Sequence, residues 1–480
     1  MVRSAVILNY MGKILVIIGI AQISVVLCAI IYSENEVIKL LISALITIMT
    51  GFMLSKTFAH NHSINYREGF AIVTLGWIAA SLFGTLPFIV SGHIPSFADA
   101  FFETVSGFTT TGASILTDVE ALPKSLLFWR SLTQWLGGMG IMALFIAIIV
   151  GLGARANQIF RAEVPGPISN KISPRVRDTA RALWLTYVVM SAVLFLLLWA
   201  FGMNIFDSLC HTFSTMATGG FSTKNQSIGY YSSPYIQWTI TLFMFLAGVN
   251  FALHYLIYKK KTLSQYWQDK EFKLYSLIII VASIIAFFGV LHISGGEEKA
   301  RAAVFQVISI MTTTGYATAD FDIWAPMGKG ILLVLMFAGA CAGSTSGGIK
   351  VGRYLIMLQR AKIELQQMVH PRAIMPLRVG DRVINDALVI NVLQFFFIYI
   401  FIVLVSTLIM SIMGLDYVSG LTAVLSCIGN IGPGFGLVGP TNNYGFLSDT
   451  AKYLLSLLML LGRLEIYPFL ILFIPQYWKE

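Results

Sequence analysis

The sequence predicts an all-α integral membrane protein, in which ten membrane-spanning helices and four short re-entrant helices form four similar units around one axis. Three observations lead to this fold class. Of the 480 residues, 57% are apolar and only 11% are charged, and one short pattern recurs four times. A soluble domain carries roughly 25% charged residues. The net charge of +9 does not indicate nucleic-acid binding, because the basic residues lie in loops between apolar stretches.

The recurring pattern is a Ser, a mostly polar run, and a Gly six positions after the Ser. Its copies are 106–112 (SGFTTTG), 214–220 (STMATGG), 309–315 (SIMTTTG) and 426–432 (SCIGNIG). An internal repeat is informative about architecture before any other feature. Thr and Gly at a loop tip suit a backbone that turns its carbonyls inward to replace the water shell of an ion. The pattern therefore predicts one pore lined by four quasi-equivalent loops.

Ten apolar stretches are long enough to cross a bilayer, which requires about 20 residues. They lie near 5–32, 36–58, 68–91, 125–152, 180–202, 234–258, 273–294, 327–358, 384–413 and 450–474. Four shorter amphipathic segments end at the four loops, and their length is typical of re-entrant helices. These segments lie near 97–109, 206–217, 302–313 and 420–430.

The repeating unit is thus a span, a short helix, a loop and a second span. Because each unit crosses the membrane twice, all four units have the same orientation, and their symmetry axis lies along the membrane normal. The expected divisions are two extra N-terminal spans and then four units, the third of which holds a gating loop. They cover 1–60, 61–152, 153–258, 259–360 and 361–480.

Loop charges predict the orientation. Three basic segments, 153–183, 259–273 and 350–382, fall on one side of the ten-span topology, so both termini and these segments are expected in the cytoplasm. The four re-entrant loops then enter from outside. The outer side carries most of the acidic loop residues, which either concentrate cations at the pore mouth or are ordinary solvated charges. They are Glu34, Glu36, Asp118, Glu120, Glu297, Glu298, Asp320 and Asp322.

The four loop tips are the expected cation-binding filter. Non-helical backbone survives inside a bilayer only where protein buries it or where it lines a hydrated path, and glycine permits close approach and unusual dihedrals there. The filter residues are expected to be Thr110, Thr111, Gly112, Thr218, Gly219, Gly220, Thr313, Thr314, Gly315, Asn430, Ile431 and Gly432. Aligned short helices would point their negative C-terminal ends at the axis and favour a cation.

Further polar residues recur at equivalent places in the short helices. Asp99 and Asp207 stand near two helix starts, where a carboxylate can cap the N-terminus. Equivalent positions further along hold Glu103, His211, Gln306 and Ala423. We interpret the polar members of this set as hydrogen-bonded support for the loops, and not as proton carriers.

The closing span of the third unit contains a run rich in glycine and hydroxyl side chains. Each glycine costs a helix interior roughly 1 kcal/mol relative to alanine, so we expect a helix broken into a flexible gating loop beneath the filter. The alternative is a small-residue surface for helix packing. The loop residues are Gly339, Gly343, Ser344, Thr345, Ser346, Gly347 and Gly348.

Arg463 lies within the last apolar stretch, where a charge is costly and by default suggests function. We expect it to face the pore below the filter, where its charge opposes cation passage. The alternative is a position nearer the cytoplasmic interface, reached by snorkelling. Glu465, two residues away, lies on another helix face and is a poor direct partner.

Enzyme chemistry has no support in the sequence. The seven histidines are dispersed, and no metal-protease, serine-hydrolase or phosphate-loop motif is present. The four cysteines show no metal-binding spacing and are expected to be buried apolar residues.

Taken together, the four loops, the break at 339–348, Arg463 and the run 67–70 (REGF) resemble the bacterial Trk/Ktr potassium-uptake superfamily. The two extra N-terminal spans are more similar to its TrkH/TrkG branch than to KtrB. The resemblance implies a potassium-translocating, multi-pass subunit of the bacterial inner membrane, with K⁺ as the transported ion and no cofactor on this chain. It also implies a homodimer and a cytosolic TrkA-like regulatory ring that binds ATP, ADP or NAD.

Two loops depart from a uniform filter, because the second has Gly219 before its glycine and the fourth has Asn430 and Ile431. Unequal loops are expected to hold an ion less tightly, which leaves a poorly selective K⁺/Na⁺ conduit as one alternative. In related plant proteins a Ser in place of the first filter Gly goes with sodium transport, so Gly112 favours potassium. A sodium- or proton-coupled carrier is a further alternative, although such carriers usually bury several ionisable residues at mid-membrane.

Overall fold

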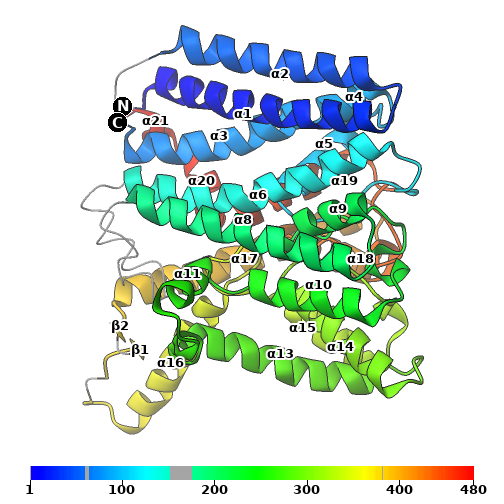
Figure 1. Ribbon diagram of the computed structural model, residues 1–480. Coiled ribbons are helices and arrows are strands. Elements are labelled where there is room, and N and C mark those ends of the chain that lie inside the picture. Colours follow the sequence, from blue (N-terminus) through cyan, green and yellow to red (C-terminus); the bar gives the residue numbers. More distant parts are fainter. Residues whose placement is uncertain (1, 60–63, 152–175, 374, 381, 480) are drawn as a thin grey trace.

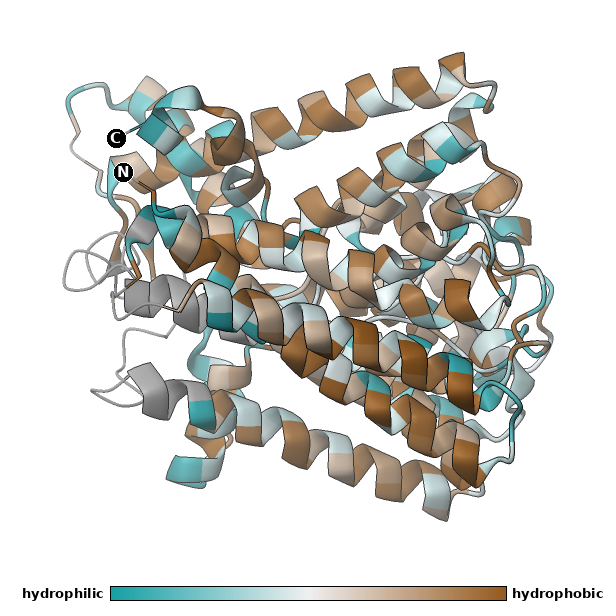
Figure 2. Cartoon of the chain, turned by 90° about the horizontal axis from the view of Figure 1, so that it is seen from above, coloured by the Kyte–Doolittle hydropathy of each residue, from teal (hydrophilic) through white to brown (hydrophobic). Residues whose placement is uncertain are grey.

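The computed structural model describes residues 2–59, 64–151, 176–373, 375–380 and 382–479, and its regular structure is almost entirely helical (Figure 1). Among these residues, six helices are long and apolar enough to cross a membrane, or up to eight if each of two bent pairs is one span. Hydrophobic residues run along the helices (Figure 2), and both chain ends lie at one end of the molecule. The chain is an all-helical membrane protein.

Two N-terminal helices, α1 (Ser4–Ile31) and α2 (Val37–Thr57), pack against each other. Their backbones approach closely at glycines. A methyl group built on Gly12 would lie 2.5 Å from the amide nitrogen of Ser55, and one on Gly51 would lie 2.7 Å from the amide nitrogen of Val16. Small residues permit this kind of contact between membrane helices, where burial of apolar surface drives little association.

Gly51→Leu is therefore expected to separate α1 from α2, because the new side chain has no space between the two backbones. Overpacking costs about 1–3 kcal/mol, so the melting temperature of the purified protein in detergent should fall by several degrees. Gly69→Ala is a suitable control, since nothing lies within 4 Å of a methyl group built there. Equal melting temperatures for Gly51→Leu and the unmodified chain would contradict the packing argument.

The next segment contains α3 (Tyr66–Gly84), α4 (Leu86–Ser91), α5 (Phe97–Phe108) and α6 (Lys124–Gly151). The expected span 68–91 is divided between α3 and α4 because Pro87, which has no amide hydrogen, stands at the start of α4. Glu68 explains the motif at 67–70. Its carboxylate is buried, accepts a hydrogen bond from the amide of Asn65, and pairs with Arg3 at 2.6 Å.

The second segment comprises α8 (Val176–Ala200), α9 (Ile205–Met216), η2 (Ser227–Tyr230), α10 (Pro234–Ala247), α11 (Phe251–Lys260) and α12 (Ser264–Gln268). The span expected at 234–258 is wrong as one helix, because α10 and α11 meet at an angle of 96°. In the basic segment 153–183, Arg155, Arg161, Lys171 and Arg175 lie outside the described residues.

The third segment comprises α13 (Lys270–Gly289), α14 (Gly296–Met311), η3 (Phe321–Ile323), α15 (Pro326–Met336), α16 (Val351–Val369) and the antiparallel strands β1 (Arg378–Val379) and β2 (Arg382–Val383). The short helix α14 begins six residues before the expected 302. The expected span 327–358 is interrupted between α15 and α16, so the predicted break in the helix is confirmed.

The fourth segment comprises α17 (Asp386–Ile412), α18 (Tyr417–Gly429), η4 (Gly436–Val438), α19 (Asp449–Arg463), α20 (Tyr467–Leu470), η5 (Ile471–Phe473) and α21 (Pro475–Lys479). The last expected span, 450–474, is also bent, by 114°, after α19. Glu465 and Ile466 at the bend both have positive φ, at 54° and 65°.

The four short helices α5, α9, α14 and α18 share one packing arrangement. Each contacts a helix that precedes it and the helix that follows it in its own segment, and also a helix from the neighbouring segment. The neighbouring contacts pair α5 with α19, α9 with α6, α14 with α10, and α18 with α15. Because the last segment contacts the first, this chain of contacts closes on itself and brings the four loops that follow the short helices together.

Candidate functional site

The four loops share one backbone conformation. Two residues before each final glycine, a residue adopts the left-handed conformation, which L-residues rarely adopt and which costs about 1–3 kcal/mol. Its φ is 55° at Thr110, 55° at Thr218, 57° at Thr313 and 54° at Asn430. The final glycines Gly112, Gly220, Gly315 and Gly432 also have positive φ, at 82°, 77°, 79° and 104°. The same strain at four places indicates that a common function maintains it.

The recurring Ser has a structural role in this conformation. In each copy its carbonyl oxygen accepts a hydrogen bond from the amide five residues later, directly before the final glycine. These four bonds join Thr111 to Ser106, Gly219 to Ser214, Thr314 to Ser309 and Ile431 to Ser426, and each is 2.8 Å long. The bond ends the short helix and turns the chain, which explains the constant spacing between Ser and Gly.

The final glycines form a closed ring with the carbonyl groups of the neighbouring loops. A methyl group built on Gly112 would lie 2.2 Å from the Gly219 carbonyl oxygen, and one on Gly220 would lie 1.9 Å from that of Thr314. A methyl group built on Gly315 would lie 1.9 Å from the Ile431 carbonyl oxygen, and one on Gly432 would lie 2.8 Å from the Thr111 carbonyl oxygen. Any larger side chain would clash with the neighbouring carbonyl, so the close packing of the ring explains why each loop has glycine at this position.

The ring opens into a cavity of about 170 Å³ whose lining includes all four final glycines. The cavity lies at the end of the molecule opposite the chain termini. The side-chain amide of Asn225, a residue that lines the cavity, donates to Asp118 at 2.8 Å and holds the pKa of that carboxyl below its ordinary value. Several other acidic residues expected at this mouth are paired, since Glu120 contacts Lys224 at 3.2 Å and Glu297 contacts Arg301 at 2.6 Å.

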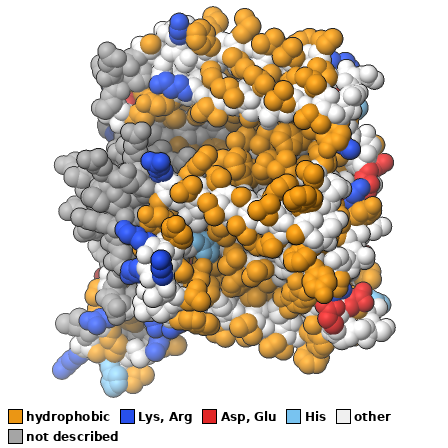
Figure 3. All heavy atoms as spheres, viewed as in Figure 1, with side chains coloured by type: hydrophobic (Ala, Val, Ile, Leu, Met, Phe, Trp, Pro, Cys, Tyr) orange, Lys and Arg blue, Asp and Glu red, His pale blue; other side chains and the backbone are white. Residues whose placement is uncertain are grey.

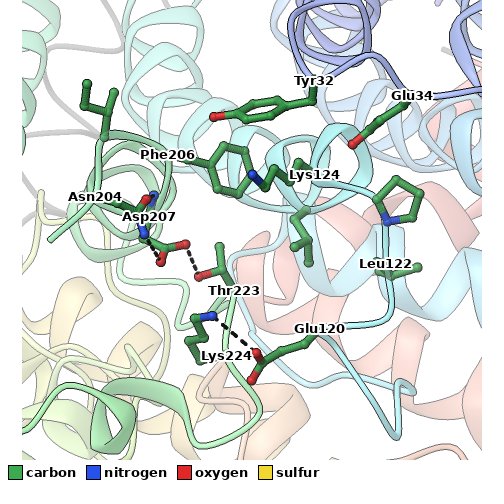
Figure 4. A pocket seen from close by; sticks show the side chains of 13 residues that line it. Tyr32, Glu34, Glu120, Leu122, Lys124, Asn204, Phe206, Asp207, Thr223 and Lys224 are labelled. Carbon is green, nitrogen blue, oxygen red and sulfur yellow. Dashed lines mark hydrogen bonds and ion pairs between the residues drawn. The ribbon is translucent and has the colours of Figure 1, made fainter.

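A second, larger cavity of about 710 Å³ is lined by none of the four final glycines (Figure 4). It is formed by the turn between α1 and α2, the start of α6 and the start of α9. Lys124 projects into it and lies over the ring of Tyr32, 4.1 Å from its centroid. Its wall includes Asp207, which accepts a hydrogen bond from Thr223 at 2.6 Å.

The structure corrects the expected helix caps. Ser96 and Asn204 cap α5 and α9, because their side chains accept hydrogen bonds from the amides of Asp99 and Asp207, at 3.4 and 2.8 Å. Asp99 and Asp207 therefore stand three residues inside the cap, in the first turn, and Asp207 accepts a hydrogen bond from the Asn204 side chain at 2.7 Å. Asp99 pairs with Lys452 at 2.6 Å. The capping prediction placed the right helices but the wrong residues.

The predicted loop support is confirmed. Glu103 accepts a hydrogen bond from the amide of Ile115 at 3.0 Å, and His211 contacts the Ser222 hydroxyl at 3.0 Å. Gln306 donates to the Tyr316 carbonyl at 3.4 Å. Each side chain thus holds the chain segment that follows its own filter glycine.

Sequence reasoning missed two residues of α6 that contact the second loop. Gln134 donates from its Nε2 to the Gly219 carbonyl at 2.6 Å and accepts from the amide of Phe221 at 3.1 Å. Arg130 donates to the Ser222 carbonyl at 3.1 Å and pairs with buried Glu103 at 2.7 Å. The one available signal was two polar side chains four residues apart, which in an apolar stretch share a helix face.

The expected gating loop lies directly against residues of the filter loops. The amide of Gly347 donates to the Thr313 hydroxyl at 2.7 Å, and the Thr345 hydroxyl donates to the Met216 carbonyl at 3.1 Å. The Thr218 and Thr345 hydroxyls are 3.4 Å apart. Gly347 also lies against Asn430, since a methyl group built on it would be 2.8 Å from the Asn430 Cβ. The loop is therefore in contact with three of the four left-handed residues.

The two ends of this loop are fastened together. Gly339 donates to the Ile349 carbonyl at 2.8 Å, and a carboxylate oxygen of Glu271 accepts from the amides of both Ala342 and Gly352 at 2.8 Å. The ammonium of Lys350 donates to the Ser346 hydroxyl at 3.0 Å. The loop is therefore a hydrogen-bonded segment in this structure.

Arg463 stands at the last residue of α19 and is 1% exposed. Its guanidinium donates to the Thr345 carbonyl of the loop at 2.7 Å and to the Gly137 carbonyl of α6 at 3.0 Å. The snorkelling alternative is therefore wrong. Glu465 is not its partner, as expected, because Glu465 pairs with Arg353. Arg463 thus joins the loop to α6 of the first segment.

Comparison with known proteins gives a consistent assignment. The model of the family described as "TrkH: Cation transport protein" matches residues 35–480. The Trk system potassium uptake protein TrkH of Escherichia coli K12 is 40% identical over 422 residues, which cover 86% of each chain. That of Halomonas elongata is 35% identical over 479 residues and 99% of each chain.

The fold is also similar to that of a solved relative. The crystal structure of the potassium transporter TrkH from Vibrio parahaemolyticus superposes with a TM-score of 0.90 at 33% identity, and covers 99% of this chain and 100% of that one. Because the family model spans most of the sequence and full-length relatives exceed 30% identity, this chain belongs to the TrkH family of cation transport proteins.

Proposed function

We propose that this chain is the ion-translocating, channel-like subunit of a Trk-type potassium uptake system in a bacterial inner membrane. The observation that carries the proposal is the closed ring in which each filter glycine faces a carbonyl of the next loop. Carbonyl rings of this kind replace the hydration shell of K⁺. The names of the relatives, potassium uptake proteins of Trk systems, support K⁺ as the ion. Family membership makes the chain a transporter and not an enzyme.

The proposal includes the arrangement around the ring. Two N-terminal spans (1–60) precede four pore units (61–152, 153–258, 259–360 and 361–480), which together give ten spans with α5, α9, α14 and α18 as re-entrant helices. The neighbour-to-neighbour packing of these short helices supports this division. Both termini are proposed to be cytoplasmic, since Lys and Arg gather at their end of the molecule and Asp and Glu at the other (Figure 3).

The loop 339–348 and Arg463 are proposed as the gate. The loop closes the cytoplasmic side of the ring, and Arg463 adds a positive charge there. A homodimer is proposed, with a cytosolic TrkA-like ring that binds ATP, ADP or NAD and opens the gate. Two basic regions at the end that holds the termini are available for that contact, at Lys259 to Lys261 and around the hairpin of β1 and β2.

The first test is rubidium uptake into liposomes that hold the purified protein, at a set membrane potential, with K⁺ or Na⁺ as competitor. Block by K⁺ alone supports the proposal. Equal block by both ions would instead favour a poorly selective conduit, which the unequal loops make the second candidate. Uptake that appears only when the cytosolic partner is added indicates a closed gate. Dependence on a Na⁺ or pH gradient at fixed voltage would indicate the coupled carrier.

Deletion of 343–348 is expected to raise uptake in the absence of the partner, because the loop residues that contact Thr218 and Thr313 are removed. Uptake into the same liposomes measures the effect, with gel filtration to verify the fold. A folded deletion variant without uptake would show that the loop is needed for structure or conduction, and would contradict the gate.

A further inference from the structure

The second filter loop lacks a side chain that the others have. The residue before the final glycine is Thr in the first and third loops, Ile in the fourth and Gly219 in the second. The hydroxyls of Thr111 and Thr314 each contact the hydroxyl of the Thr two residues earlier, at 2.8 Å. The second loop cannot form this brace, because it has Ala217 and Gly219 at the two positions.

Gln134 of α6 fills the space of the missing side chain. A methyl group built on Gly219 would lie 2.4 Å from the Gln134 Cδ, so the amide group occupies the place of a side chain at 219. Gln134 is fully buried. The second loop therefore takes its support from another segment of the chain and not from its own residues.

The contacts of Gln134 fix the orientation of the filter backbone. Its Nε2 donates to the Gly219 carbonyl at 2.6 Å and its Oε1 accepts from the Phe221 amide at 3.1 Å, so the two bonds bracket Gly220. One turn earlier, Arg130 donates to the Ser222 carbonyl at 3.1 Å and lies over the Phe221 ring, 4.0 Å from its centroid. Three hydrogen bonds from one face of α6 thus hold residues 219–222.

One of these bonds reaches a carbonyl oxygen of the ring. The Gly219 carbonyl oxygen is the one that faces Gly112, and it is also the acceptor of Gln134. Selection between K⁺ and Na⁺ depends on the number, position and field strength of the carbonyl dipoles around the ion. A hydrogen bond to one of four carbonyls changes both its direction and its field.

We propose that Gln134, one turn after Arg130 on α6, is a positioning residue that sets the Gly219 carbonyl and thereby contributes to K⁺ over Na⁺ selection. The proposal rests on the potassium function proposed above. Buried ion pairs contribute little net stability because their desolvation is costly, so the Glu103–Arg130 pair at 2.7 Å serves mainly to orient Arg130.

The test compares Gln134→Met with Gln237→Met. The first variant keeps the volume of the side chain and loses both bonds to the second loop. The control changes the same residue type in a buried site of α10, where Gln237 bonds to the Tyr231 carbonyl and to Arg301 and not to the ring. The readout is the ratio of the Na⁺ and K⁺ concentrations that half-inhibit rubidium uptake, with the partner present if the unmodified chain requires it.

We expect this ratio to fall about tenfold in Gln134→Met, as the loss of a hydrogen bond in the ring predicts, and to be unchanged in Gln237→Met. A structural role alone would lower yield or rate in both variants and leave the ratio intact. If Gln134→Met does not fold, Gln134→Glu replaces it, since its carboxylate still accepts from Phe221 but cannot donate to Gly219. The same fall in the ratio is expected.

The outcomes separate the two proposals. If the unmodified chain is selective for K⁺ and the folded Gln134 variant keeps the same ratio of half-inhibiting Na⁺ and K⁺ concentrations, only the positioning role is overturned. Equal competition by K⁺ and Na⁺ in the unmodified chain would overturn the potassium function, and the positioning role with it.

Discussion

Gly315→Ser is expected to remove most of the preference for K⁺ over Na⁺. A Cβ atom at this position would lie 1.9 Å from the Ile431 carbonyl oxygen and 2.9 Å from the Cδ of Pro433. Ordinary contacts between carbon and oxygen are about 3.3 Å, so the third and fourth loops must separate by roughly an ångström. The residue also has φ of 79°, which disfavours any side chain.

The widened ring is expected to lower the K⁺ preference by about tenfold or more, since 1.4 kcal/mol of differential binding is a factor of ten. Rubidium uptake with K⁺ and Na⁺ as competitors measures it. Gly330→Ser is the matched control in the same segment, because nothing lies within 4 Å of a Cβ built there. An unaltered ratio of K⁺ to Na⁺ flux in Gly315→Ser would argue against the filter assignment.

Arg463→Ala is expected to raise uptake without the partner. The change removes the bonds from the guanidinium to the loop at Thr345 and to α6 at Gly137, of 2.7 and 3.0 Å, together with a positive charge beneath the ring. Hydrogen bonds of charged groups contribute about 1.5–3 kcal/mol. If the closed loop loses that amount relative to an open one, basal uptake should increase about tenfold or more.

Two further variants separate the effect of the lost hydrogen bonds from that of the lost positive charge. Arg463→Lys keeps the charge, but a single ammonium cannot reproduce the planar fork that contacts two carbonyls, so an intermediate uptake is expected. Arg301→Ala removes another buried arginine, whose bonds go to Gln237 and Glu297 and not to the loop 339–348, and should not open the gate. If Arg463→Ala and the unmodified chain have equal basal uptake, Arg463 is not part of the gate.

Local patterns in the sequence were sufficient to locate the loops and most helices. The constant spacing of Ser and Gly reflects a hydrogen bond within each loop, such as that from Thr111 to Ser106, so it is visible in one short stretch of sequence. The break at 339–348 was visible for the same reason, because glycines within an apolar run disfavour a helix wherever they stand.

The bend between α10 and α11 was not predictable in this way. One glycine and one asparagine at 248 and 250 are a weak local signal for a bend. In the structure the Gly248 carbonyl accepts from the amide of Cys341, and the Gly343 carbonyl accepts from that of Phe251. The bend therefore exists because another segment supplies the hydrogen bonds that the helix lacks. The contacts of Gln134 and Arg130 join residues 85 and 92 positions apart, which no local pattern reports.

The closed ring has a consequence for how such a protein can evolve. In a tetramer of identical chains, one mutation alters all four loops at once, so small adjustments are impossible. Here each loop is encoded separately, and a substitution alters one quarter of the ring. Since each glycine faces the carbonyl of the next loop, mutations in adjacent loops should be epistatic, whereas those in opposite loops should combine additively. The second loop differs from the others because Gln134 of another segment supports it. Gene duplication followed by drift permits this kind of divergence.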